Sequence, residues 1–291
     1  MISPGLLTTV QDLGRFGYAH LGISASGAAD ALALRTGNLL VGNTETAAAI
    51  EMTLAGGAFE FERDAVAAIT GGDFDASIPL WRAVPVSAGE VLRCGHARSG
   101  ARAYLSVRGG LDVPVVLGSC STHLLTGLGG FEGRVLRKGD VLRIGDAAVR
   151  RPRTGPCAPR PASIGELRAT SGPQASHFDD TFYRGDYQVS TESDRMGLRL
   201  SGPTLTASGG HMLTEGVAIG AVQVPPDGQP LILFVEHQTT GGYPKIANVI
   251  SADLWRVGQL RPHDRIRFAR VTLDEAYARL REQEAWLHGL V

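Results

Sequence analysis

The stretch QPLILFVEHQTTGGYPKIANVISADLWRVGQLRPHDRIRFA, residues 229–269, contains the pattern that decides the fold. An apolar, strand-like run leads into a polar Thr-Gly-Gly bend, and a Leu-Arg-x-x-Asp sequence then precedes a second alternating run. The same order occurs in the first half, where ARAYLSVRGG (101–110) is followed by the loop GSCSTHLLTGLGG (118–130) and by LRKGDVLRIG (136–145). This recurrence predicts a duplicated β unit and two related barrels with a cleft between them. Chance similarity between short β segments is the alternative.

Short apolar runs bounded by glycine and proline occur along the whole chain, which has 38 glycines and 15 prolines. Such spacing is typical of barrels and sandwiches. Helical patterns are fewer. One runs from about Ala28 to Leu40 with Ser26 as a cap, and another begins at Thr272 or Asp274 near the C-terminus. We therefore expect a mainly β protein with a few short helices.

The domain organisation follows from a break in periodicity. Four prolines and five arginines fall between Arg150 and Arg168, a composition typical of a linker. We expect an N-terminal β-barrel domain with one helix over residues 1–150, a linker over 151–163, and a C-terminal β-barrel domain with a terminal helix over 164–291. The arginines are interpreted as solvent-exposed charges of the linker and not as a binding patch.

Composition excludes several classes of function. A net charge of −1 does not indicate the excess of basic residues that is typical of nucleic-acid-binding proteins. No apolar run approaches the roughly 20 residues that cross a bilayer. We find no secretory signal, and three widely spaced cysteines (Cys94, Cys120 and Cys157) favour reduced thiols in the cytoplasm. The histidines lack metal-ligand spacing and neither lysine lies in a Walker loop, so we expect no metal and no phosphate loop.

The bend QTTGGYPKIA (238–247) is the main candidate for chemistry. Gly241 and Gly242 are expected to adopt positive φ and to let a ligand approach the main chain. Thr239 and Thr240 add hydroxyls, and Lys245 is one of only two lysines, the other being Lys138. A hairpin turn with incidental threonines is the structural alternative.

Polar clusters elsewhere add candidates. Gln11, Asp12 and Arg15 stand among glycines, Asp30 begins a helix where it caps or faces a cleft, and the Asp194–Arg195 pair follows a strand. Adjacent Asp-Arg pairs are more often structural than catalytic. Cys120 lies between two serines but is interpreted as a structural thiol, because nothing near it in sequence lowers its pKa.

Four segments carry a family resemblance: TTVQDLGRFGYAHLGISASGAAD (8–30), YLSVRGGLDVPVVLGS (104–119), SDRMGLRL (193–200) and QTTGGYPKIANVISADL (238–254). In this order they resemble the carboxyltransferase-like family that includes the C subunit of 5-oxoprolinase. The family also contains the urea carboxylase carboxyltransferase domain, often labelled allophanate hydrolase subunit 2, and a sporulation-kinase-inhibitor antagonist. The resemblance implies two tandem cyclophilin-like β-barrels and, as partner, a smaller cyclophilin-like protein of the B-subunit type. Two positions depart from the family pattern: Ala29 replaces Met, and Cys120 replaces Arg.

The leading functional hypothesis is the C subunit of an ATP-dependent 5-oxoprolinase, which acts with the B subunit and a third component to hydrolyse 5-oxo-L-proline to L-glutamate. Carboxyl transfer from biotin to urea or a related amide is the alternative. It requires a separate carrier, because the chain lacks a Met-Lys biotinyl motif. A third hypothesis is a non-enzymatic regulator of a kinase inhibitor. No cofactor is expected to bind tightly. ATP is assigned to another member of the complex, and biotin applies only to the alternative.

The hypothesis assigns two sets of residues by their chemistry. The catalytic set supplies oxyanion donors and a base for water, with His237 as a further base candidate. The substrate-binding set includes arginines that hold a carboxylate as a fork. The catalytic residues are Lys245, Glu236, Asp194, Thr239 and Thr240, and the substrate-binding residues are Arg15, Gln11, Asp30, Arg195, Gln238, Gly241, Gly242 and Tyr243.

Overall fold

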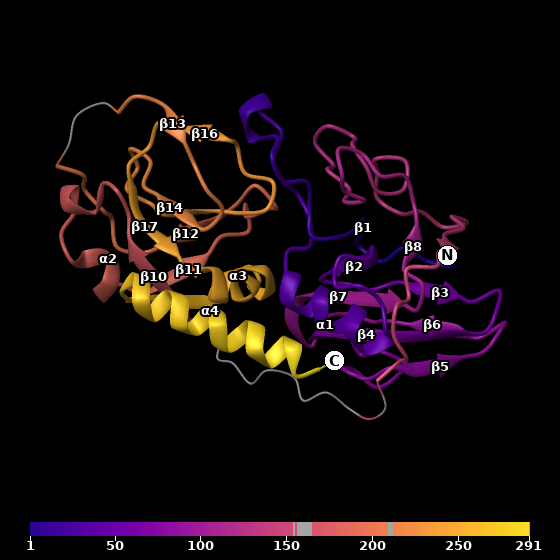
Figure 1. Ribbon diagram of the computed structural model, residues 1–291. Helices are drawn as coiled ribbons and strands as arrows, with labels where there is room; N and C mark the ends of the chain where they lie inside the picture. Colours follow the sequence, from indigo (N-terminus) through magenta and orange to yellow (C-terminus); the bar gives the residue numbers. More distant parts are fainter. Residues whose placement is uncertain (154, 156–164, 209–211, 291) are drawn as a thin grey trace. The chain divides into compact units, whose positions relative to one another are not determined.

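The computed structural model describes residues 1–153, 155, 165–208 and 212–290 (Figure 1). Strands outnumber helices, which confirms the mainly β prediction. The chain divides into two compact units, the first made of Met1–Arg15, Ser26–Pro161 and Trp286–Val291, and the second of Phe16–Ala25 and Ala162–Ala285. The expected domain limits at 150 and 164 stay a prediction, and most of the predicted linker lies outside the described residues.

The bounds of the elements are as follows. The strands are β1 Leu7–Gln11, β2 Ala49–Thr53, β3 Ala58–Glu60, β4 Ala65–Asp73, β5 Val84–Val86, β6 Val91–Arg93, β7 Ser99–Val107, β8 Leu111–Asp112, β9 Arg143–Ile144, β10 Glu166–Ser171, β11 Tyr187–Val189, β12 Gly197–Ser201, β13 Glu215–Gly216, β14 Ala221–Gln223, β15 Leu231–Leu233, β16 Thr240–Gly241, β17 Lys245–Val249 and β18 Arg265–Arg270. The helices are α1 Ala31–Val41, α2 Thr181–Arg184, α3 Leu254–Gln259 and α4 Leu273–His288, with short 3₁₀ turns at Ala19–Leu21, Ala175–His177 and Ser251–Asp253.

The first unit is built on an antiparallel five-stranded sheet in the order β1-β2-β7-β4-β5, with the small pairs β3-β6 and β8-β9 beside it. Side chains alternate between the faces of this sheet. Ile50 and Leu105 enter the main core, whereas Ala49 and Tyr104 pack with residues of α1. Covering both faces explains why β2 and β7 are almost continuously buried.

Helix α1 begins later than predicted. Asp30, not Ser26, is its N-cap, because the Asp30 carboxylate accepts a hydrogen bond from the Ala33 N–H at 2.8 Å. Gly37 lies in the helix interior, where a Cβ would come within 2.7 Å of Ser106 Oγ and 2.9 Å of Thr70 Oγ1. Because Gly37 has no side chain, α1 can pack closely on the sheet, and this packing offsets the low helix propensity of glycine.

The second unit contains a closed barrel in the order β10-β17-β14-β15-β12-β11-β18. Neighbouring strands are antiparallel except β10 and β18, which close the barrel as a parallel pair. Closure leaves no unpaired edge within this ladder. The barrel predicted for this half is thus confirmed, while the described strands of the first half pair as an open sheet.

The Leu-Arg-x-x-Asp recurrence has the same local structure in both units. Asp140 Oδ2 accepts the Arg137 N–H at 2.7 Å, and Asp264 Oδ2 accepts the Arg261 N–H at 2.8 Å. In each turn the arginine carbonyl also accepts the aspartate N–H at 3.1 Å. The strands that follow differ in use, since β18 joins the barrel whereas β9 pairs only with β8.

Helix α4 begins as the sequence predicts. Thr272 Oγ1 accepts the Glu275 N–H at 3.2 Å, and Glu275 Oε2 accepts the Thr272 N–H at 2.7 Å. These reciprocal bonds form a capping box, which satisfies two N–H groups at the helix start.

An ion pair between Arg168 and the buried Asp253 joins the first barrel strand, β10, to the segment that precedes α3. The Asp253 carboxylate is fully buried and accepts bonds from Arg168 Nε at 2.9 Å, Arg168 Nη2 at 2.5 Å and the Arg168 N–H at 2.9 Å. These bonds raise the pKa of Arg168. They fix the first barrel strand against the segment that contains the Ser251–Asp253 turn and α3.

We expect Asp253→Ala to lower the free energy of unfolding by about 1–3 kcal/mol, because the substitution leaves the half-buried Arg168 without its principal counter-charge. Urea unfolding followed by circular dichroism measures the change. Asp186→Ala is the matched control, since it breaks an exposed Asp–Arg pair with Arg267 and should leave the midpoint nearly unchanged. Equal midpoints for the two variants would contradict this role for Asp253.

Candidate functional site

The Thr-Gly-Gly bend is held in a two-stranded ribbon of the second unit. Strand β16 pairs with β13, so that Gly241 faces Glu215 and Thr240 faces Gly216 (Figure 1). The bend then leads into β17, whose first residue, Lys245, is paired with Gln223 of β14. The predicted loop therefore has a fixed shape rather than the freedom of an open turn.

Lys245 is buried and surrounded by polar partners. Its ammonium group forms an ion pair with the Glu215 carboxylate, and its N–H donates to Gln174 Oε1 at 3.0 Å. Gln174 Nε2 donates in turn to Glu215 Oε1 at 3.1 Å. The hydrogen bond from Lys245 lowers the pKa of the Glu215 carboxyl, which therefore stays ionised. Burial of the lysine is tolerated because the ammonium is paired and hydrogen-bonded.

Gln223 fills the space beside Gly241. Its side chain is completely buried, and its Oε1 accepts Gln238 Nε2 at 3.4 Å. A Cβ on Gly241 would lie 2.5 Å from Gln223 Nε2, whereas one on Gly242 would meet Thr214 Oγ1 at an ordinary 3.5 Å. The predicted positive φ at these two glycines is wrong, since neither lies in the left-handed region. Gly241 makes room for the Gln223 amide.

Arg195 and Glu236 form a buried ion pair beside the same loop, with Arg195 Nε 2.5 Å from Glu236 Oε1. The Glu236 N–H also donates to the Arg195 carbonyl at 2.8 Å. Asp194 is exposed, and its Oδ1 accepts the N–H groups of Met196 at 2.8 Å and Gly197 at 3.2 Å. Both predicted carboxylates are thus engaged in local structure.

His237 is half-buried between this pair and the bend. Its Nδ1 lies 2.6 Å from the Gln238 carbonyl oxygen, an acceptor, so the proton is on Nδ1 and Nε2 carries the lone pair. Burial lowers the pKa of His237, which favours the neutral imidazole near pH 7. Thr239 is half-buried, and Thr240 and Tyr243 are exposed on the bend.

The candidates of the first unit converge on residues 119–122. Gln11 Nε2 donates to the Thr122 carbonyl at 3.1 Å, and Arg15 Nη2 donates to the Ser121 carbonyl. Asp12 accepts from Ser119 Oγ at 2.6 Å, Ser121 Oγ at 2.5 Å and the Cys120 N–H at 2.6 Å. These polar side chains determine the shape of the segment around Cys120.

Asp30 belongs to a buried network at the start of α1. Besides capping the helix, its N–H donates to Tyr104 Oη at 2.7 Å, and that hydroxyl donates to Glu51 Oε2 at 2.6 Å. Burial and the neighbouring Glu51 charge raise the pKa of Tyr104 far above its ordinary value. The tyrosine is therefore a permanent hydrogen-bond donor at this site.

The described cysteines are not activated nucleophiles. Burial, and then the charge of Asp12, raise the pKa of Cys120, and burial raises the pKa of Cys94 to about 12. Both thiols therefore remain protonated at neutral pH. Cys157 lies outside the described residues.

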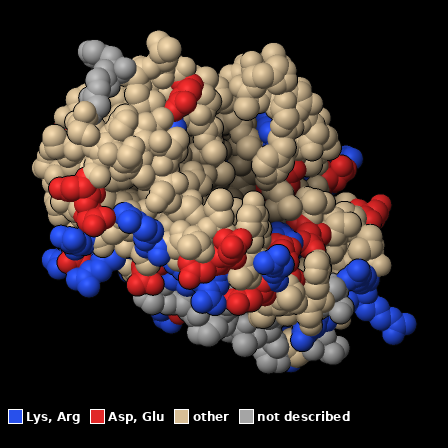
Figure 2. Space-filling model, turned by 60° about the vertical axis from the view of Figure 1, so that its left-hand side comes forward, with Lys and Arg blue, Asp and Glu red and all other residues tan. Residues whose placement is uncertain are grey.

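Charged side chains of both signs lie on one face of the protein. On the face drawn in Figure 2, acidic and basic side chains are interspersed, with no extended area of a single sign. Within the described part of the chain, no three His, Cys, Asp or Glu side chains are grouped as metal ligands. The same residues include no helix that is long and apolar enough to cross a membrane.

The structure groups the predicted residues into two sets. Gln11, Arg15 and Asp30 belong to the first unit and the other ten to the second, and a cleft that joins them stays a prediction. Three further residues of the site, Gln174, Glu215 and Gln223, are not among the residues predicted from the sequence. A glutamine inside the apolar run AVQVP was a readable signal for Gln223, whereas Gln174 and Glu215 lie far from Lys245 in the sequence and no local pattern marks them.

Comparison with known proteins identifies relatives of this chain. The family described as carboxyltransferase domain, subdomain A and B, matches residues 21–270. The chain belongs to this family. It is 41% identical over 302 residues to the C subunit of the Escherichia coli 5-oxoprolinase, with 100% of this chain and 96% of that protein covered.

Larger enzymes contain the same domain. The chain is 34% identical to the urea amidolyase of Lachancea kluyveri, where 99% of this chain matches 18% of that protein. The crystal structure of the K. lactis urea amidolyase is similar with a TM-score of 0.92 and 31% identity, and covers 100% of this chain and 20% of that one. The chain thus spans about a fifth of the urea amidolyases.

The two glycines of the bend provide a matched test. We expect Gly241→Ala to lower the melting temperature, at a cost of about 1–3 kcal/mol, because its Cβ would overlap the buried Gln223 amide. Gly242→Ala should leave the melting temperature within a few degrees of the parent protein. Differential scanning calorimetry measures both, and equal effects of the two substitutions would refute the packing role of Gly241.

Proposed function

We propose that this chain is the C subunit of a 5-oxoprolinase, which hydrolyses 5-oxo-L-proline to L-glutamate with ATP. Full-length likeness to the C subunit of the E. coli 5-oxoprolinase, at 41% identity over 100% of the chain, is the observation that carries this proposal. The name of that relative marks it as one component of an assembly. We propose a cyclophilin-like B subunit and a third component as partners here, with ATP bound outside this chain.

The chemistry sets requirements for the site. A five-membered lactam has an unactivated carbonyl, so hydrolysis needs activation of the carbonyl oxygen and a base for the attacking water. Charge develops on that oxygen in the transition state, where pre-organised donors stabilise it. The substrate also carries a carboxylate, which a guanidinium group can bind as a fork.

Lys245 is the proposed donor to the developing oxyanion. Its ammonium is buried, and Glu215 and Gln174 hold the side chain and main chain of the residue in place. A fixed charge in a partly desolvated site stabilises a transition state more than a mobile one in water. Thr239 and Thr240 supply hydroxyls on the same bend, and Arg195 or Arg15 is the proposed partner of the substrate carboxylate.

His237 is the proposed general base. Glu236 is paired with Arg195, and Asp194 accepts two backbone N–H groups, so we propose His237 ahead of these two carboxylates as the base. His237 presents Nε2 with its lone pair because Nδ1 donates to the Gln238 carbonyl. Its lowered pKa keeps the imidazole neutral at physiological pH, as a base requires.

Carboxyl transfer is the second candidate. The TM-score of 0.92 to a urea amidolyase favours it, although this chain spans only 20% of that protein. In this reaction the Lys245 site would stabilise the ureido oxygen of biotin while a base takes the proton of the acceptor amide. Biotin would come from a separate carrier protein.

Removing the ammonium group of Lys245 should greatly lower turnover. We expect Lys245→Met to reduce glutamate release from 5-oxoproline and ATP by about 100-fold or more in the complex with its partner proteins, as for loss of one oxyanion donor. Lys138→Met is the matched control, since it removes the exposed lysine and should retain full activity. Near-normal turnover by Lys245→Met would remove the bend from the mechanism.

The same assay separates the two candidate reactions. Glutamate release without biotin supports the hydrolase. Biotin-dependent bicarbonate turnover with urea, together with no glutamate release, would reverse the ranking.

The pH profile tests His237. Because burial lowers the pKa of His237, protonation should inactivate the enzyme only on the acid side of pH 6.5, and kcat/KM should fall as pH decreases through that lowered value. His237→Gln should lose activity at all pH values, while His96→Gln, at an exposed position, should keep the parent profile. An unchanged acid limb in His237→Gln would exclude this residue as the base.

A further inference from the structure

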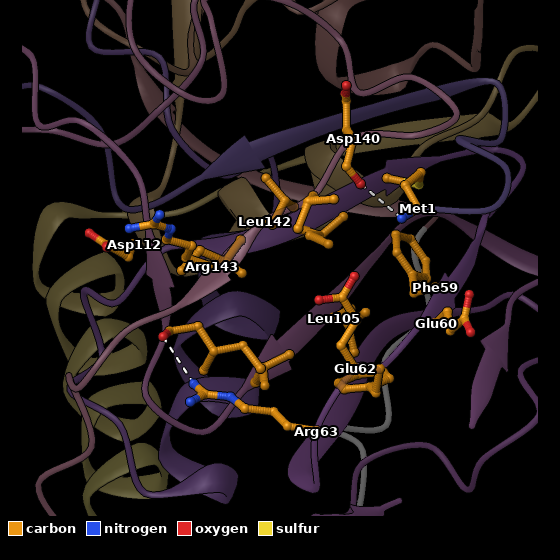
Figure 3. Close-up of a pocket in the computed structure, with 16 residues that line it drawn as sticks. Met1, Phe59, Glu60, Glu62, Arg63, Leu105, Asp112, Asp140, Leu142 and Arg143 are labelled. Carbon is orange, nitrogen blue, oxygen red and sulfur yellow. Dashed lines mark hydrogen bonds between the residues drawn. The ribbon is translucent and has the colours of Figure 1, made fainter. Parts of the chain in front are cut away.

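A cavity of about 570 Å³ lies entirely in the first unit, beside the sheet face formed by β2 and β7 (Figure 3). Its size falls within the roughly 300–1,000 Å³ of small-molecule sites. None of the residues predicted for catalysis or substrate binding lines it. The cavity is therefore distinct from the Lys245 site, and a ligand bound in it does not depend on the proposed hydrolase activity.

Apolar side chains form one part of the cavity wall, and charged residues line the rest. Ile50, Leu105 and Val107 from the sheet and Phe59 from β3 belong to the buried core of the unit, and the half-buried Leu142 packs against that core. An apolar group that enters would remove hydrocarbon surface from water, which favours binding. The cavity thus favours a ligand with a compact hydrocarbon body.

One carboxylate without a hydrogen-bond partner among the described residues points into the cavity. Figure 3 shows the Glu62 carboxylate directed toward the space between Leu142 and Phe59, while the carboxylates of Glu60 and Asp140 point away. Asp140 is already paired with Arg134 at 2.8 Å. Within the described residues, Glu62 makes no hydrogen bond or ion pair, so its charge is available to a ligand.

Three cationic groups of the described residues also line the cavity: the side chains of Arg63 and Arg143 and the ammonium group of Met1, which donates to the Asp140 carbonyl at 2.8 Å. Arg63 crosses the edge of the cavity and its Nη2 donates to the Ile144 carbonyl at 3.1 Å, as Figure 3 shows. This bond ties the segment after β3 to β9. Arg143 lies beside Asp112 in Figure 3, away from the Glu62 carboxylate.

We propose that this cavity is a binding site for a small amphipathic cation. The hydrocarbon body lies against Ile50, Leu105 and Phe59, and a protonated amine pairs with Glu62. Charge complementarity selects an amine over an alcohol or an acid of the same shape, because only the amine supplies both a positive charge and donors to the carboxylate.

The test uses three isosteric probes, 2-phenylethylamine, 2-phenylethanol and phenylacetate, titrated into the full chain and followed by calorimetry and by NMR shifts. We expect saturable binding of the amine, and at least about tenfold weaker binding of the alcohol and the acid. Glu62→Gln should weaken amine binding about tenfold. Glu60→Gln is the matched control and should change it by less than about twofold.

Leu142→Trp tests the location, since the larger side chain fills the cavity from its half-buried wall and should remove amine binding. Circular dichroism confirms that each variant is folded, and both glutamate positions are exposed. Failure of the amine to bind at millimolar concentration, equal binding of the alcohol, or equal effects of the two glutamine substitutions would overturn the proposal.

Discussion

The structure depends on the requirement that a buried charge must have its partners within hydrogen-bond reach. An isolated buried ion costs several kcal/mol, which a marginally stable fold cannot tolerate. Asp253 meets Arg168, Lys245 meets Glu215, and Asp12 meets two serine hydroxyls and a backbone N–H. Each group of contacts joins segments far apart in the chain, so satisfying these charges also fixes the loops on which they lie.

This requirement also divides the candidate residues by role. A carboxylate that neutralises a buried guanidinium or caps a turn serves the fold, and Glu236 and Asp194 are in that position. His237 and Lys245 differ because one presents a neutral imidazole nitrogen and the other an ammonium held on a fixed bend. The proposed chemistry therefore uses a histidine whose Nε2 carries the lone pair and a lysine whose ammonium is held in place by Glu215.

Local patterns predicted much of the secondary structure. The helix start at Thr272 was among the predicted ones, and it depends on a capping box whose residues are three positions apart. The Leu-Arg-x-x-Asp recurrence was predicted only as a repeat, and the structure shows that each copy forms the same local turn. The start of α1 was less well predicted, since Ser26 and Asp30 are both acceptable caps by local propensity. Packing against Tyr104 and Glu51 selects Asp30.

The bend at residues 238–247 has a composition that the sequence displays and contacts that it does not. Its composition by itself identified a polar, glycine-containing loop with a rare lysine after an apolar strand, and the resemblance of its motif supplied the family. Only the tertiary structure showed that Gly241 makes room for the Gln223 amide and that Gln174 and Glu215 hold Lys245. Turns and caps depend on neighbours in the chain, which a sequence displays directly. The partners of a buried charge come from distant segments, and these meet only when the barrel closes.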